Sequence, residues 1–224
     1  DKAMIRTSKR AVPSRRITPT SALVYGILLN VFSFILLNFT VNFTSAFLTI
    51  FASLFYIFIY TIYLKPRTTQ NIVIGGAAGC FPPVIAWVGI IGYEGLFNLS
   101  PWFMFLIVFL WTPPHFWALA LYSNEDFTKA GLPMLPVTHG AVHTKWQMLI
   151  YTCVLVVVTL LPYVLGYAGL IYGVSALVLG GLFLLSNVNV LKEKHGYKQA
   201  KLMFGYSIFY LFAIFGALVI DRFV

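Results

Sequence analysis

Seven long apolar runs follow one another along the chain, and polar residues collect in the segments between them. A helix of about 20 apolar residues is long enough to cross the hydrocarbon core of a bilayer. We place the runs at residues 20–40, 43–63, 72–92, 102–121, 148–166, 169–190 and 203–221. The pattern predicts an all-α, polytopic membrane protein: a bundle of seven transmembrane helices in a single domain over residues 1–224.

The composition excludes a soluble globular domain. Hydrophobic residues make up 60% of the 224 positions and charged residues only 9%, whereas a soluble domain has roughly 25% charged residues. So few charges cannot cover the surface of a globule. The two cysteines, Cys80 and Cys153, fall inside predicted spans without a CxxC partner, which is typical of structural thiols.

Basic residues lie almost entirely on one side of the predicted bundle. Of the 15 lysines and arginines, all except Arg222 precede the first helix or follow the second, fourth or sixth. The positive-inside rule makes that side cytoplasmic, or the matrix side in a mitochondrion. We expect a bacterial inner membrane, with the mitochondrial inner membrane as the alternative. Topology thus accounts for the net charge of +9, and no nucleic acid partner is needed to explain it.

Hydrogen-bonding and titratable side chains are concentrated on this same inward face. The outward loops, around residues 40–42, 92–100 and 167–168, are short and almost uncharged. A transporter would more readily place its polar groups near the middle of the membrane, on broken helices. The distribution therefore favours an enzyme that is embedded in the bilayer and works at its cytoplasmic interface.

The first inward cluster is the opening segment, DKAMIRTSKR, which combines Asp1 with Arg6, Lys9 and Arg10. Basic side chains bind phosphate oxygens, arginine through its bidentate fork, and Asp1 could hold a divalent cation. The same residues also suit a basic flank that sets topology and binds anionic lipid headgroups. The segment by itself does not decide between the two interpretations.

A second cluster joins the second and third helices in the stretch YTIYLKPRTTQN. Tyr63, Lys65 and Arg67 stand where one helix ends, and Asn71 begins the next, where free backbone amides favour an anion. Anchoring of tyrosine and lysine at the membrane border is the alternative. These residues are candidates for binding an anionic substrate.

The third helix itself combines small residues with an internal break. Gly75 and Gly79 form a small-xxx-small face, which predicts close packing against another helix. The pair Pro82-Pro83 predicts a bend, because proline removes backbone donors and clashes with the preceding turn. A helix that is both thinned and bent can border a cavity.

The third cluster is WTPPHFWALALYSNEDF. Trp111 and His115 share a helix face, and His115 lies about 10 Å inside the cytoplasmic end at 1.5 Å per residue. An ionisable residue at that depth is a functional candidate; the alternative is a neutral imidazole bonded to a carbonyl that Pro113-Pro114 frees. Glu125 and Asp126 follow at the exit, where carboxylates suit Mg²⁺, unless they are ordinary surface acids.

Two of these stretches, WTPPHFWALAL…EDF…AGLPMLPV and YLKPRTTQNIVIGGAAGCFPP, closely resemble the haem-farnesylating branch of the UbiA-type intramembrane prenyltransferases. The opening DKAMIRTSKR resembles the tail of that family's first aspartate-rich motif. Specific motifs carry the resemblance from Asp1 to about Val137. After Val137 it rests only on the pattern of apolar residues. It implies a nine-helix bundle whose first two helices, with the earlier part of the motif, are absent from this sequence. The fragment alone is then expected to be inactive.

The resemblance implies transfer of a farnesyl group from farnesyl diphosphate to a vinyl group of haem b, giving haem O inside the lipid bilayer. Mg²⁺ would neutralise the diphosphate and be bound by Asp1, Asp126 and Glu125. The product would pass to a haem A synthase or a terminal oxidase. The implied diphosphate and substrate contacts are Arg6, Lys9, Arg10, Tyr63, Lys65, Arg67, Asn71, Trp111 and Trp117.

Aromatic side chains would stabilise the allylic cation through cation–π contacts, with Trp111, Phe116, Trp117 and Tyr63 as candidates. His115 would contact the haem iron or a propionate, or handle a proton, and the three roles stay open. One departure is Tyr122, which stands where the family's second motif carries a further aspartate. The same departure is seen in the haem branch.

Two other functions remain as alternatives. The first stays within the same fold: prenylation of a different aromatic or chlorin acceptor. The second is a non-enzymatic membrane protein that binds or transports haem. That protein would need no Mg²⁺ and would release no diphosphate, and it would tolerate replacement of Asp1, Arg67 and Asp126.

Overall fold

The computed structural model describes residues 7–224, and helices are the regular secondary structure of this range. Seven of its helical spans are long and apolar enough to cross a membrane, which confirms the predicted fold class. The spans are Pro19–Thr40, Phe43–Leu64, Asn71–Ile91, Leu99–Tyr122, Gly140–Val164, Leu170–Lys192 and Lys198–Ile220. Two of them begin earlier than predicted, at Gly140 and Lys198, because helical hydrogen bonding continues past the apolar run into polar turns at the interface.

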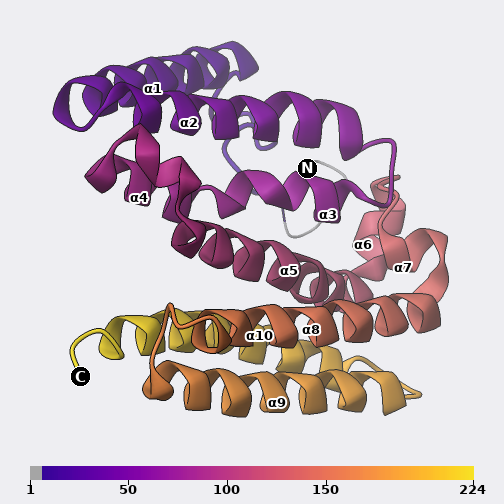
Figure 1. The fold of residues 1–224 in the computed structure, drawn as a ribbon. Helices are drawn as coiled ribbons and strands as arrows, with labels where there is room; N and C mark the ends of the chain where they lie inside the picture. The colour runs from indigo at the N-terminus through magenta and orange to yellow at the C-terminus, as the bar shows by residue number, and fades with distance from the viewer. Residues whose placement is uncertain (1–6) are drawn as a thin grey trace.

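The spans are arranged in three layers (Figure 1). Helix α1 (Pro19–Thr40) packs on α2 (Phe43–Leu54) at one side of the molecule. The middle layer holds the third span and α5 (Leu99–Tyr122). On the other side lie α8, α9 and α10, whose bounds are Gly140–Val164, Leu170–Lys192 and Lys198–Ile220.

The core lies between α5 and the three C-terminal helices. Its largest fully buried side chains include Trp117 from α5, Tyr172 and Phe183 from α9, and Tyr210 from α10. By contrast, α1 has no buried residue, and its apolar side chains face outward as those of a lipid-facing helix do. The middle helix α5 therefore links a well-packed half of the molecule to a more open one.

The second and third spans depart from regular α-helix where they face α5. After α2 the second span continues as a π-helix, η1 (Phe55–Leu64). The third span is α3 (Asn71–Gly76), a 3₁₀ turn η2 (Ala77–Cys80), and α4 (Pro82–Ile91) with the proline pair in its first turn. The break expected at Pro82-Pro83 is present, because proline fits the start of a helix but not its interior.

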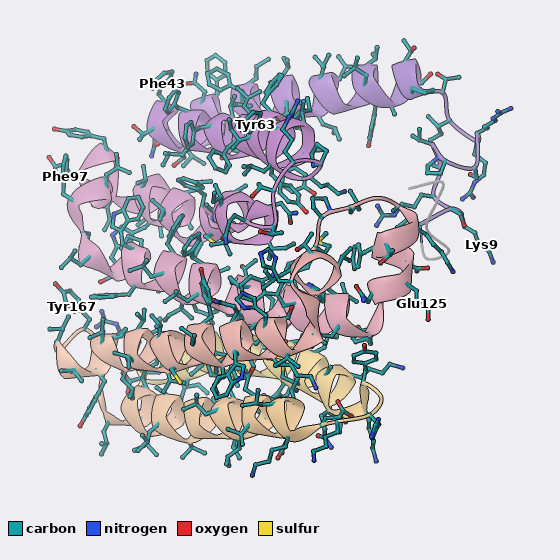
Figure 2. All side chains as sticks on the ribbon, turned by 90° about the vertical axis from the view of Figure 1, so that its right-hand side faces the viewer. Lys9, Phe43, Tyr63, Phe97, Glu125 and Tyr167 are labelled. Atoms are coloured by element: carbon teal, nitrogen blue, oxygen red, sulfur yellow. The ribbon has the colours of Figure 1, made fainter. Side chains whose placement is uncertain are left out.

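Polar connections gather at one end of the bundle. Figure 2 shows Lys9 and Glu125 at this end, whereas Phe43, Phe97 and Tyr167 lie at the opposite end. Two short helices, α6 (Asn124–Lys129) and α7 (Leu135–Thr138), follow α5 at the polar end, and a 3₁₀ turn, η3 (Tyr93–Phe97), precedes it at the other. The separation agrees with the predicted sidedness of the chain.

Candidate functional site

An aromatic cavity of about 510 Å³ lies between α2, the π-helix η1, the third span and α5. Four rings form much of its wall: Tyr56, Tyr60, Trp111 and Phe116. Small residues complete the lining, namely Ala52, Ser53, Gly75, Gly76, Ala78 and Gly79. The cavity therefore offers aromatic faces, which attract cations, in a space that small side chains keep open.

Two glycines set how closely the walls of the aromatic cavity approach one another. A Cβ atom on Gly75 would lie 2.1 Å from Cδ2 of Tyr60, and a Cβ atom on Gly76 would lie 2.7 Å from Cγ2 of Thr112. Gly79 has no neighbour within 4 Å of such an atom. The close-packing positions are thus Gly75 and Gly76, and the prediction for Gly79 was wrong: it faces the open cavity.

His115 lies inside an aromatic stack at the boundary between α5 and α10. Its imidazole is 7% exposed and stacks on Trp111, with ring centroids 4.2 Å apart, and on Phe204, with centroids 4.4 Å apart. Trp111 also lines the aromatic cavity, whereas His115 is not part of that lining. His115 therefore touches the cavity wall from behind, through the indole of Trp111.

Ser207 on α10 holds both rings. Its carbonyl oxygen accepts a hydrogen bond from Nε1 of Trp111 at 2.7 Å, and its hydroxyl lies 2.6 Å from Nδ1 of His115. The hydroxyl also donates to the carbonyl of Phe204 at 2.6 Å. Because a serine hydroxyl has one hydrogen, it must accept from Nδ1–H of the imidazole. Neutral His115 then carries its proton on Nδ1, and Nε2 is the basic nitrogen.

The prolines of α5 have a different consequence from the one predicted. The helix runs without interruption from Leu99 to Tyr122, with Pro113 and Pro114 inside it and buried. The imidazole of His115 bonds to a hydroxyl of α10 and not to a carbonyl freed by the prolines. The prolines thus neither end α5 nor free the hydrogen-bond partner of His115.

The acids after α5 lie in the first turn of α6, beside a buried amide. Glu125 is exposed and Asp126 half-buried, and within residues 7–224 neither carboxylate has a hydrogen-bond partner. The side-chain oxygen of Asn124 is buried without a partner. The described residues contain no group of three or more metal-binding side chains, so a cation here needs further ligands.

Asn71 is brought to the same region by a small apolar cluster. Its neighbour Ile72 packs with Phe127 of α6 in a cluster that also contains Ala120 and Met134. Asn71 is fully buried, its amide nitrogen donates to the carbonyl of Thr68 at 2.7 Å, and its side-chain oxygen has no partner. Asn71 and Asp126 each lie one residue from a member of that cluster, which brings the second and third sequence clusters together.

The cationic residues after η1 are arranged around the end of that helix. Nη1 of Arg67 donates to the carbonyls of Ile62 and Tyr63, at 3.1 and 3.2 Å, and its guanidinium lies over the ring of Tyr63, 5.0 Å from the centroid. The ring of Tyr63 is 58% exposed. Lys65 is the C-cap residue that follows η1. The side chain of Arg67 thus satisfies carbonyls of η1, and none of the three residues lines the aromatic cavity.

The remaining predicted residues have different placements. Asp1 and Arg6 lie outside the described residues. Lys9 and Arg10 are exposed at the polar end. Trp117 is 2% exposed and packs edge-on against Tyr151 of α8, so the structure places it in the helix core and away from the aromatic cavity.

Comparison with known proteins agrees with the sequence motifs. A model of the UbiA prenyltransferase family matches residues 1–213. The chain belongs to the UbiA prenyltransferase family. No solved structure matches it.

The relatives carry one shared name. The chain is 48% identical to a protoheme IX farnesyltransferase of Acidiphilium cryptum, over 100% of this chain and 72% of the relative. It is 46% identical to the enzyme of that name in Erythrobacter litoralis, over 100% of this chain and 73% of the relative. It is 46% identical to the enzyme of that name in Neorickettsia sennetsu, over 99% of this chain and 71% of the relative. The UbiA-family similarity thus continues past Val137, where the sequence motifs ended.

Sequence reasoning missed three features of this UbiA-family site. Ser207 lies in an apolar helix without any motif, and only the packing of α10 on α5 shows its role. Tyr56 and Tyr60 fall within an apolar run, and their spacing of four residues was the available signal for a shared face. The amide of Asn124 could have been found from its position before two acids.

Proposed function

We propose that this chain transfers a farnesyl group from farnesyl diphosphate to a vinyl group of protohaem IX, giving haem O. The observation that carries the proposal is the 46–48% identity, across essentially the whole chain, to relatives named protoheme IX farnesyltransferase. The aromatic cavity and the neighbouring acids are the physical features that such a reaction needs.

The reaction balances without an oxidant or a reductant. The bond between C1 of the farnesyl group and the diphosphate oxygen breaks, and diphosphate leaves with the electron pair. The vinyl group supplies the electrons for the new carbon–carbon bond to C1. Water then adds to the cation left on the former vinyl carbon, and one proton is released, which gives the hydroxyethylfarnesyl side chain of haem O.

The aromatic cavity suits the allylic cation of the first step. A cation within about 6 Å of an aromatic face is stabilised by the ring quadrupole, and more so when it is desolvated. Such rings line the cavity from η1, which carries Tyr56 and Tyr60, and from α5, which carries Trp111 and Phe116. Water exclusion by the apolar lining would also protect the cation until the vinyl group attacks.

The polar end suits a diphosphate with Mg²⁺. Within residues 7–224 the carboxylates of Asp126 and Glu125 and the side-chain oxygens of Asn124 and Asn71 have no partner, and they are the hard oxygen donors that Mg²⁺ takes together with substrate phosphates. A bound ion would neutralise the leaving diphosphate. Lys65, Arg67, Lys9 and Arg10 place further positive charge at the same end of the bundle.

His115 acts, in this proposal, through its position. Ser207 fixes the imidazole against Trp111, which keeps the indole face in the cavity wall, and Nε2 is left as a basic nitrogen behind it. The sequence left three roles open for His115. The stack supports ring positioning, because His115 contacts Trp111 and is not part of the cavity lining.

The chain is an integral membrane protein with seven candidate spans. The relatives compared above are bacterial proteins. We therefore place it in a bacterial inner membrane with the polar end, and the proposed site, on the cytoplasmic side.

The test is product formation in membranes that contain the protein at its natural length, supplied with haem b, farnesyl diphosphate and Mg²⁺. Mass spectrometry should find haem heavier by one farnesyl group and one hydroxyl group. Asp126→Ala should lower the rate by about a hundredfold or more, as expected for the loss of a group that holds charge at the leaving atoms. Glu94→Ala, which removes an exposed acid at the opposite end, is the matched control and should leave the rate unchanged.

Other outcomes separate the alternatives. Diphosphate release with 4-hydroxybenzoate but not with haem b would keep the chemistry and replace the acceptor. Failure to release diphosphate with any acceptor would overturn the enzymatic proposal in favour of a haem-binding or transport protein.

A further inference from the structure

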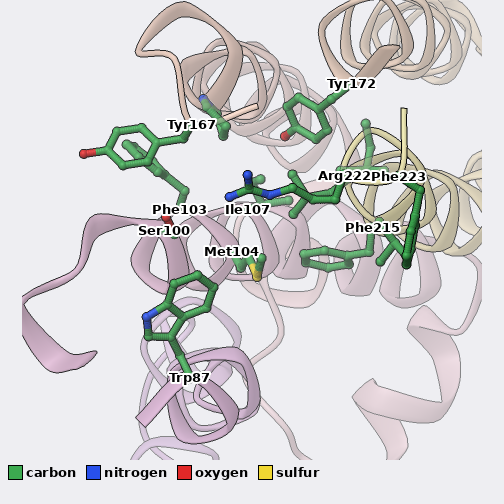
Figure 3. A pocket seen from close by; sticks show the side chains of 14 residues that line it. Trp87, Ser100, Phe103, Met104, Ile107, Tyr167, Tyr172, Phe215, Arg222 and Phe223 are labelled. Atoms are coloured by element: carbon green, nitrogen blue, oxygen red, sulfur yellow. The ribbon is translucent and has the colours of Figure 1, made fainter. Parts of the chain in front are cut away.

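A second cavity, of about 350 Å³, is lined by Tyr167 among others, which Figure 2 places at the end of the bundle opposite Glu125; Figure 3 shows this cavity from close by. We call it the outward cavity. Its wall is apolar and includes Trp87 of α4, Phe103, Met104 and Ile107 of α5, and Phe215 of α10. The volume is at the lower end of the ~300–1,000 Å³ that is usual for ligand pockets. It is separate from the aromatic cavity, with which it shares no lining residue.

One cation stands at this cavity. Arg222 is the single lysine or arginine of the chain that falls on the outward side, and it is among the lining residues. Figure 3 shows its guanidinium reaching between Ile107 and Tyr172. Within residues 7–224 the guanidinium donates no hydrogen bond, and it lies near a single acid, Asp221.

The neighbouring acid is engaged elsewhere. The carboxylate of Asp221 accepts hydrogen bonds from the backbone amides of Gly169 and Tyr172, the latter at 3.1 Å, and so caps the start of α9. The hydroxyl of Tyr172, another lining residue, donates to the carbonyl of Thr159 at 2.8 Å. Arg222 therefore keeps its donors for an anion from outside the protein.

The depth of the outward cavity matches the outer part of a lipid leaflet. Arg222 lies two residues after the end of α10 at Ile220, so its charge lies at the level of the headgroups. Ile107 lies eight residues into α5, which begins at Leu99, or about 12 Å along the helix at 1.5 Å per residue. The cavity thus runs from the headgroup level into the region of the acyl chains.

We propose that the outward cavity binds a phospholipid of the outer leaflet, with one acyl chain in the apolar space and the phosphate on Arg222. A guanidinium binds phosphate oxygens through two parallel hydrogen bonds. The chain replaces water in the apolar space, which is favourable. The site is independent of the proposed prenyl transfer and lies on the other side of the membrane.

Native mass spectrometry of the purified protein, at its natural length, tests the proposal by measuring Kd for phosphatidylglycerol. Arg222→Gln should weaken binding about tenfold, through loss of the charged pair. Lys194→Gln, which removes an exposed charge at the polar end, is the matched control and should have no effect. Met104→Trp should fill the cavity and weaken binding further.

Two further probes separate chain from headgroup. Diacylglycerol has the chains but no phosphate, so it should bind wild type and Arg222→Gln equally, and more weakly than phosphatidylglycerol binds wild type. Glycerol phosphate, without a chain, should not bind measurably. Equal phosphatidylglycerol affinity in wild type and Arg222→Gln would overturn the proposal, and so would tight binding of glycerol phosphate. Neither of these two tests uses Met104→Trp, so both remain valid if that variant does not fold.

Discussion

At the scale of single residues, the least expected feature is that one serine organises two predicted site residues. Ser207 bonds Trp111 through its carbonyl and His115 through its hydroxyl, and both rings then stack. The motif WTPPHFW identified Trp111 and His115 as candidate site residues, but it gave no indication of Ser207. A side chain that acts from a distant helix leaves no local pattern, so only the folded chain reveals it.

Removal of this hydroxyl should therefore affect activity more than stability. Ser207→Ala leaves the backbone bond to Trp111 but frees the imidazole of His115, and a lost hydrogen bond of this kind costs about 1 kcal/mol of stability. We expect the farnesyl transfer rate to fall about tenfold or more, as the ring stack loosens.

Ser45→Ala is the matched control for that experiment. Its hydroxyl is also buried and donates to the carbonyl of Ile85, at 3.2 Å, away from the aromatic cavity. Thermal unfolding in detergent should show similar losses for the two variants, while the product assay separates them. Equal activity of both would show that the stack needs no hydroxyl.

At the scale of elements, the walls of the aromatic cavity depend on two close approaches, of which the closer lies between α3 and η1. Gly75→Ala would place a methyl group on the ring of Tyr60. The ring must then move into the cavity or the helices must separate, at a cost of about 1–3 kcal/mol. We expect lower thermal stability and lower activity in the same variant. Gly26→Ala in α1, where the added atom meets nothing within 4 Å, lies away from the aromatic cavity and should keep near wild-type values of both.

The contact between the start of α9 and the end of α10 should depend on pH. The amide of Gly169, followed by those of Tyr172 and Ile171 and by the charge of Arg222, holds the pKa of Asp221 below its ordinary value, against a smaller opposing effect of desolvation. The stabilisation is then present above the unfolded pKa of ~3.9 and is lost as pH falls through the lower folded value.

Comparison of Asp221→Asn with wild type measures the stabilisation that the charged carboxylate of Asp221 contributes. The difference in Tm should be greatest at neutral pH and should shrink to nothing as the medium is acidified below the folded pKa. Glu94→Gln, an exposed outward acid without a cap to satisfy, should show no such difference. A gap in Tm between Asp221→Asn and wild type that stays constant in acid would contradict the capping role.

At the scale of the whole molecule, the sequence was sufficient for the fold class and insufficient for the cavity walls. A long apolar run predicts a transmembrane helix because the backbone groups of a segment inside the bilayer must hydrogen-bond to one another. All seven spans were therefore predictable. The π-helix η1 and the unbroken path of α5 through Pro113-Pro114 depend on neighbouring helices. The burial of Trp117 depends on packing in the same way.

The sidedness of the bundle is the last prediction, and it decides where the proposed site and the outward cavity meet solvent. Within residues 7–224 all basic residues except Arg222 lie at the polar end, and moving them across a bilayer is costly. We expect a single cysteine at Lys194→Cys to be labelled from the cytoplasm and one at Glu94→Cys from the outside. Both positions are exposed.

The measurement uses a membrane-impermeant maleimide on intact cells, in a background that carries Cys80→Ala and Cys153→Ala. Only Glu94→Cys should react before lysis, and both should react afterwards. The parent without cysteines controls for labelling elsewhere. If Lys194→Cys reacts first, the bundle is inverted, the phospholipid of the outward cavity would belong to the inner leaflet, and farnesyl diphosphate would have to enter from outside. The order of labelling therefore tests the placement of both sites together.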